Sequence, residues 1–122
     1  MPEIDFAEMV KALAKDGDEI AQELSGLDAH ILHMAVGVSG EAGELIDAIK
    51  KAVIYRKDID IKNIIEELGD LEFYMEGLRQ GLGISREETI TANIEKLGKR
   101  YSDGEYSDVD AQVRADKIEG EK

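Results

Sequence analysis

The 122-residue chain contains no cysteine, so disulfides and thiolate metal sites are excluded. It has no tryptophan, and aromatic residues make up only 5% of the sequence, which allows a modest core for one compact domain. A domain of this size often gains stability by associating with copies of itself. The single proline, Pro2, leaves the rest of the chain free to form long helices.

Long apolar runs are also missing. No stretch approaches the roughly 20 apolar residues of a membrane span, and the N-terminal residues lack the basic region and apolar run of a signal peptide. We therefore expect a soluble, cytoplasmic protein that does not bind membranes.

Basic residues are scarce, with 15 Lys and Arg against 28 Asp and Glu and a net charge of -13. Non-specific nucleic-acid binding needs a basic surface, so we expect no nucleic-acid partner. An enzyme with an anionic substrate would need metal ions or clustered Lys and Arg to offset this charge.

The apolar residues recur with helical spacing throughout, which predicts an all-α domain. Gly17 could kink or break the first helix, Gly81 and Gly83 should end the third, and Ser85 begins a capping box for the fourth. The four expected helices run from about Asp5 to Leu24, from Asp28 to Tyr55, from the Asp60 cap to Gly81, and from Ser85 to Gly98–Arg100. In the third helix we expect these residues to be buried: Ile61, Ile64, Ile65, Leu68, Leu71, Met75 and Leu78.

Three glycines, Gly37, Gly40 and Gly43, recur inside the second helix. Each weakens an isolated helix by about 1 kcal/mol relative to alanine. Their presence indicates either close approach by another helix or a kink.

The composition changes after Tyr101. We expect residues 1–101 to form a single all-α domain, and residues 102–122, rich in Asp, Glu, Ser and Gly, to form an acidic tail. This tail would be flexible or would dock on a partner subunit.

Two pairs of carboxylates stand out, Glu41 with Glu44 and Glu67 with Asp70. Residues three apart lie on one face of a helix, and the short connection between the two helices predicts that they pack antiparallel. If the faces meet, four carboxylates converge, and a hard divalent cation such as magnesium, manganese or calcium would relieve their repulsion. The alternative is that all four are solvated surface acids.

At these residues the chain resembles the MazG-like nucleotide pyrophosphohydrolases of the all-alpha NTP pyrophosphatase superfamily. The family's Glu-x-x-Glu and Glu-x-x-Asp motifs correspond to Glu41–Glu44 and Glu67–Asp70. Three blocks around these motifs and beyond them, residues 40–51, 66–70 and 93–101, look like the family and follow in its order. The resemblance covers about residues 28 to 101.

The resemblance implies a four-helix subunit that pairs into a bundle-like homodimer or homotetramer. The four acids would be the catalytic residues and would ligate Mg²⁺, with Mn²⁺ as a possible substitute. Water would attack the α-phosphorus of a nucleoside triphosphate and release pyrophosphate, in the removal of non-canonical or surplus (d)NTPs. A carboxylate not saturated by metal could accept the proton of that water, with Glu44 and Glu41 as the first candidates.

Substrate-binding candidates lie on the second and fourth helices. Lys51 could meet a phosphate or simply neutralise Asp47. The fourth-helix candidates share the family's block, and a solvated, charged helix end is the alternative reading; they are Asn93, Lys96, Arg100 and Tyr101. His30 and His33 are one turn apart and could bind metal, although such residues more often pack in a core.

Two other functions stay open. Phosphoribosyl-ATP pyrophosphohydrolase belongs to the same superfamily, and turnover of plain dNTPs would separate the two reactions. A non-catalytic, metal-binding helical interaction module is the alternative from a different class.

Overall fold

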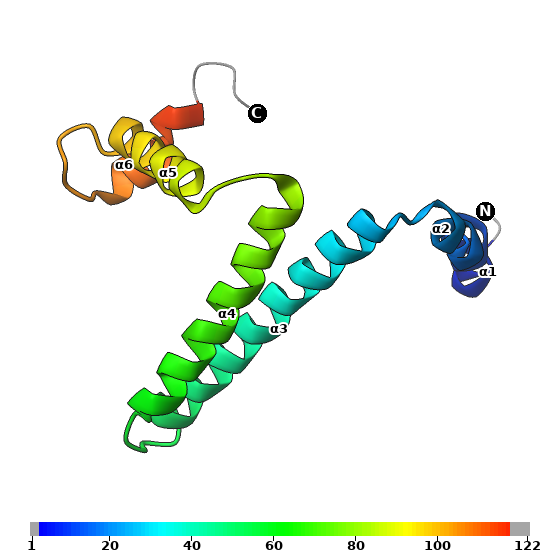
Figure 1. Cartoon of the computed structure of the whole chain (residues 1–122), viewed down its shortest axis with the longest axis horizontal. Helices are drawn as coiled ribbons and strands as arrows, with labels where there is room; N and C mark the ends of the chain where they lie inside the picture. Colours follow the sequence, from blue (N-terminus) through cyan, green and yellow to red (C-terminus); the bar gives the residue numbers. More distant parts are fainter. Residues whose placement is uncertain (1–2, 118–122) are drawn as a thin grey trace.

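The computed structural model describes residues 3–117. Within that range the chain is all-α, as predicted, and contains no strand. Figure 1 shows α1 (Phe6–Leu13), α2 (Gly17–Glu23), α3 (Gly26–Val53), α4 (Ile61–Leu82), α5 (Arg86–Arg100), α6 (Asp108–Val113) and the short 3-10 helix η1 (Ala115–Lys117). The expected four helices are therefore six α-helices, because the first one divides and a further helix forms after Tyr101.

The prediction of a single helix from Asp5 to Leu24 is wrong. Its first part ends at Leu13, and Ala14 adopts an extended backbone. Asp16 then begins α2, because its side chain accepts a hydrogen bond from the Asp18 backbone N–H. The break thus lies just before Gly17, the residue at which the sequence allowed an interruption.

The other helix ends follow the local chemistry of their caps. Asp60 begins α4 by accepting from the Asn63 N–H, and Ser85 begins α5 by accepting from the Glu88 N–H. Gly83 ends α4 with a left-handed backbone (φ 69°), a conformation that glycine adopts without steric cost. Gly81 lies inside α4 rather than at its end.

The main packing unit is the antiparallel hairpin of α3 and α4 (Figure 1). Gly37 of α3 lies directly against the Tyr74 ring of α4, and Gly77 of α4 lies against the Met34 side chain. His30 adds a hydrogen bond of 2.9 Å between its Nε2 and the Gly77 carbonyl oxygen. Of the two explanations for the glycines, close helix approach holds at Gly37, and α3 continues unbroken through Gly40 and Gly43.

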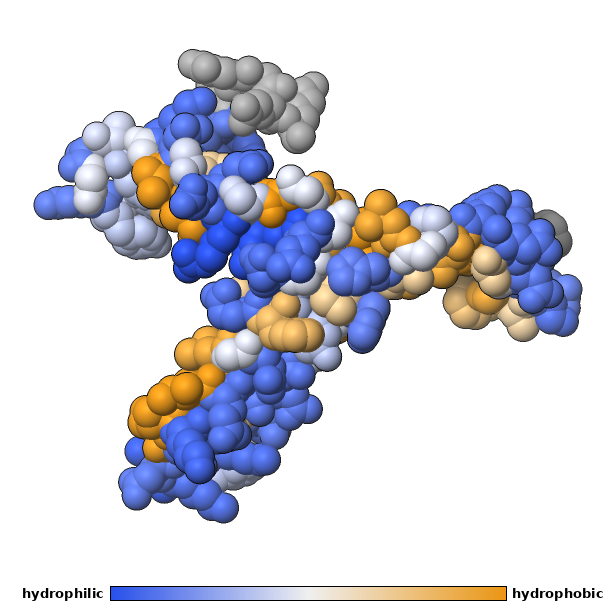
Figure 2. Space-filling model, viewed as in Figure 1, coloured by the Kyte–Doolittle hydropathy of each residue, from blue (hydrophilic) through white to orange (hydrophobic). Residues whose placement is uncertain are grey.

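Much of the apolar surface of the described chain is exposed. Met34 and Ala52 are its only buried apolar residues, and the burial expected for Ile61, Ile65 and Leu68 is wrong for a single chain, because they are 60%, 63% and 46% exposed. The accessible surface is 10069 Å², against roughly 6,500 Å² for a compact monomer of this mass. Figure 2 shows hydrophobic side chains at the surface of the α3–α4 hairpin and near α1.

Past Tyr101 the chain turns back, so that α6 and η1 both pack against α5 (Figure 1). The expectation of a flexible or partner-docking tail covers residues 102–122, of which 118–122 lie outside the described residues. Among the described helices, none combines the length and apolar content needed to cross a membrane.

Candidate metal centre and phosphate-binding residues

The α3–α4 hairpin brings together carboxylates from both helices. Glu41 of α3 and Glu67 and Asp70 of α4 each offer an oxygen atom, and these atoms lie within 4.8 Å of one another. Glu67 and Asp70 project from one face of α4 because they are three residues apart. The antiparallel packing then places that face against Glu41.

Glu67 is destabilised in its ionised form by burial and by the neighbouring carboxylates. Its side chain is half-buried, and its Oε2 is buried without a hydrogen-bond partner in the described part of the chain. Burial raises its pKa above the ordinary value, and the adjacent Glu41 carboxylate and the charges of Glu44 and Asp70 raise it further. An unpartnered, buried carboxylate oxygen among other carboxylates is what a bound cation would stabilise.

The ligand atoms of this cluster suit a hard divalent cation. All of them are carboxylate oxygens, which magnesium, manganese and calcium prefer over the nitrogen and sulfur ligands typical of zinc. The residues present therefore fit a divalent metal.

Glu44, the fourth predicted acid, stands outside the group of three atoms. It lies one turn after Glu41 on α3, and its side chain is exposed. Its charge still acts on Glu67, so it belongs to the same electrostatic environment.

The predicted substrate-binding residue Lys51 lies near the end of α3. Its Nζ is 3.1 Å from Asp47 Oδ2, and both side chains are more than half exposed. In the free chain Lys51 therefore neutralises Asp47, which is one of the two roles that the sequence allowed.

Three predicted substrate residues lie on α5 and Tyr101 is its C-cap, and α5 packs against α6 and η1 rather than beside the Glu41, Glu67 and Asp70 carboxylates (Figure 1). Three of these four residues engage the segment that follows α5. Arg100 Nε donates a hydrogen bond of 3.1 Å to Asp116 Oδ1, Tyr101 packs against the Tyr106 ring with 5.5 Å between centroids, and Lys96 lines a cavity beside Asp116. Asn93 is exposed on α5.

The two histidines of α3 contact residues of α4. His30 bonds the Gly77 carbonyl, and the His33 ring meets the Tyr74 ring edge-on. In residues 3–117 the side chains that are grouped closely enough to hold a metal are all carboxylates, and neither histidine is among them.

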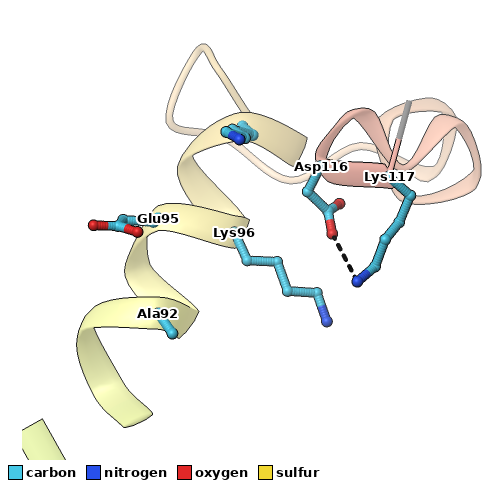
Figure 3. Close-up of a pocket in the computed structure, with 6 residues that line it drawn as sticks. Ala92, Glu95, Lys96, Asp116 and Lys117 are labelled. Carbon is cyan, nitrogen blue, oxygen red and sulfur yellow. Dashed lines mark ion pairs between the residues drawn. The ribbon is translucent and has the colours of Figure 1, made fainter. Parts of the chain in front are cut away.

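Sequence reasoning missed Asp116 and Lys117, which line the cavity on α5 (Figure 3). They stand in a stretch whose acidic composition predicted a tail. The one local sign of structure was Ser107, which caps α6 by accepting from the Asp110 N–H.

Comparison with known proteins points to one family. The model of the MazG nucleotide pyrophosphohydrolase domain matches residues 29–104. The match spans both carboxylate pairs and the whole of α5, and it ends before α6. No curated protein and no solved structure matches the chain significantly.

Proposed function

The chain belongs to the MazG nucleotide pyrophosphohydrolase family, and from that premise we propose that it is a magnesium-dependent nucleoside triphosphate pyrophosphohydrolase. It converts an NTP or dNTP to the corresponding monophosphate and pyrophosphate. The observation that carries the proposal is the convergence of Glu41, Glu67 and Asp70 around the unpartnered Oε2 of Glu67.

Glu41, Glu67 and Asp70 would hold the metal, and Glu44 would complete the set from the next turn of α3. A bound divalent cation supplies charge neutralisation for the phosphates and Lewis acidity at the scissile anhydride. Mg²⁺ is the proposed ion because it binds through carboxylates together with substrate phosphates, and Mn²⁺ would replace it.

The proton of the attacking water needs an acceptor. We assign this role to Glu44, with Glu41 as the second candidate, because Glu44 is outside the group of three and its exposed carboxylate has a second oxygen that a metal contact through the first would leave free. Water then attacks the α-phosphorus, its proton passes to the carboxylate, and pyrophosphate leaves.

The position of α5 beyond the far end of α4 supports a site that two subunits share. Asp70 lies 12 residues before Leu82 along α4, a rise of about 18 Å, and α5 begins only after that end. We therefore propose a homodimer or homotetramer in which Asn93, Lys96, Arg100 and Tyr101 of one subunit face the carboxylates of another. Lys51 would exchange Asp47 for a phosphate when substrate binds.

The biological role that fits this reaction is nucleotide-pool housekeeping in the cytoplasm. The substrates would be non-canonical or surplus nucleoside triphosphates. Neither nucleic acid nor membrane is needed as a partner.

The test is to incubate the protein with Mg²⁺ and a panel of canonical and modified NTPs and dNTPs, and to resolve the products by chromatography. We expect monophosphate and pyrophosphate. Glu44→Gln should lower kcat by about 10²-fold or more, whereas Glu72→Gln, an exposed carboxylate elsewhere on α4, should leave it unchanged.

Other products would change the assignment. Diphosphate with orthophosphate would mean that the wrong anhydride bond had been identified. Turnover of phosphoribosyl-ATP alone would select the related reaction, and turnover of no nucleotide would leave a metal-binding interaction module.

A further inference from the structure

The segment after the family domain is fixed to α5 by one buried carboxylate. Asp116 of η1 is only 6% exposed and lies beyond residues 29–104, which the family model matches. Its Oδ1 accepts the hydrogen bond from Arg100 Nε, in a pair whose side chains are 16% and 5% exposed. Burial raises the Asp116 pKa, but the hydrogen bond and charge of Arg100 outweigh burial and hold the pKa below the ordinary range.

This contact determines how Arg100 is presented. Since the Arg100 side chain bonds Asp116 through Nε, the N–H groups of its two terminal nitrogens remain, within residues 3–117, for another acceptor. A guanidinium fixed at Nε is oriented to bind a phosphate through its terminal nitrogens in a bidentate manner.

Three lysines surround the cavity beside this arginine. The cavity has a volume of about 310 Å³ and is lined by Lys96 and Lys99 from α5 and by Lys117 from η1. In Figure 3 the Lys96 and Lys117 side chains extend toward the same space as the Asp116 carboxylate, and Glu95 points away from it.

Asp116 also contributes its second oxygen to this arrangement. Asp116 Oδ2 is buried without a hydrogen-bond partner in residues 3–117, and Lys117 Nζ lies 3.9 Å from it. The carboxylate thus lies between Lys117, which lines the cavity with it, and Arg100, which adjoins the cavity through its bond to Asp116. Three cations, Lys96, Lys99 and Lys117, line the cavity against two acids, Glu95 and Asp116, in a chain whose net charge is -13.

We propose that α5 and η1 together form a polyphosphate-binding site. Asp116 is its positioning residue, Lys117 is an additional binding residue, and the ligand is a pyrophosphate or triphosphate group. In part this rests on the proposed function, because that reaction uses a triphosphate as its substrate and releases pyrophosphate.

The binding test uses the full chain, inorganic pyrophosphate and isothermal titration calorimetry in buffer without divalent cations. We expect binding that weakens with added salt, and weaker binding of orthophosphate, which spans fewer cations. Arg100→Lys keeps a positive charge for Asp116 but loses the bidentate contact, so it should weaken binding about tenfold or more. Lys117→Ala should weaken it by up to about fivefold, and Lys57→Ala, outside the cavity, should have no effect.

The positioning role of Asp116 has its own readout. Asp116→Asn should raise the KM for the nucleotide and weaken pyrophosphate binding. Its kcat should be kept, because the proposed chemistry occurs at the acids of α3 and α4. Circular dichroism checks that the variant keeps its helix content, and Arg100→Lys tests the same contact with Asp116 intact.

Three results would overturn the inference: no pyrophosphate binding by the unmodified chain, unchanged binding in Arg100→Lys, or tighter binding in Asp116→Asn. The last would mean that Asp116 competes with phosphate for Arg100. Pyrophosphate binding without any nucleotide turnover would leave this site standing and reject the proposed reaction.

Discussion

Among the four acids, Glu67 is the one whose protonation the fold changes most clearly. Burial, together with the Glu41, Glu44 and Asp70 carboxylates, raises its pKa. A raised pKa means that the folded protein without metal holds the Glu67 proton more tightly than the unfolded chain does. Its contribution to stability is therefore present below the ordinary glutamate pKa, about 4.3, and is lost as the pH rises through the raised value.

A divalent cation needs the ionised form of Glu67, so its affinity should rise with pH over this same window. We expect titration calorimetry with Mg²⁺ or Mn²⁺ at a series of pH values to show tighter binding as the pH increases. Glu67→Gln should weaken binding by at least about tenfold and should flatten the pH dependence.

Glu72→Gln is the matched control, because the Glu72 side chain on the same helix is 55% exposed. Its cation affinity and pH profile should equal those of the unmodified protein. A Glu67→Gln variant that binds cation as well as the unmodified protein would remove Glu67 from the proposed ligand set.

At the scale of the helices, the position of the carboxylates depends on how closely α3 and α4 approach. Gly37 permits that approach, since a Cβ atom there would overlap the Tyr74 ring. Gly40, one turn further along α3, has no heavy atom within 4 Å of the position that its Cβ would take in the described chain.

Gly37→Ala should therefore destabilise the protein by about 1–3 kcal/mol through overpacking. Gly40→Ala should be neutral or should stabilise it by about 0.5–1 kcal/mol, because alanine is the better helix former. The midpoint of urea unfolding measures both changes. Equal midpoints for the two variants would show that the Tyr74 contact does not limit the spacing of the helices.

At the scale of the whole molecule, the single chain exposes more surface than a compact protein of its mass. The excess over the compact value, about 3,500 Å², exceeds the roughly 800 Å² that each partner buries in a standard interface. An apolar patch at the C-terminal end of α3, which includes the C-cap Ile54, offers one surface for such association; its members are Leu45, Ile46, Ile49, Val53 and Ile54. This surface supports the proposed homo-oligomer.

Ile46 belongs to this apolar patch and is 68% exposed, so a charge there should oppose association. We expect Ile46→Glu to lower the mass measured by sedimentation equilibrium, and its Tm to lose the concentration dependence of an oligomer. Val109→Glu, on an exposed residue of α6 outside the patch, is the control. A monomeric unmodified protein would contradict the proposed assembly and the shared site.

The sequence by itself determined the helical class, most helix ends and the identity of the acids. Those features are local: apolar spacing follows the helical repeat, and Asp60, Ser85 and Gly83 act on neighbouring backbone groups. The break at Asp16 was less clear, because a capping aspartate and a helical surface aspartate look alike in sequence.

Only the tertiary structure decided which charged groups meet. It placed Glu41 beside Glu67 and Asp70, left Ile61 and Ile65 exposed in the single chain, and paired Arg100 with Asp116. These outcomes depend on the direction in which α4 returns along α3 and the chain after Tyr101 returns along α5. Spacing within one helix determines the face on which a residue lies, whereas packing between helices determines what that face contacts.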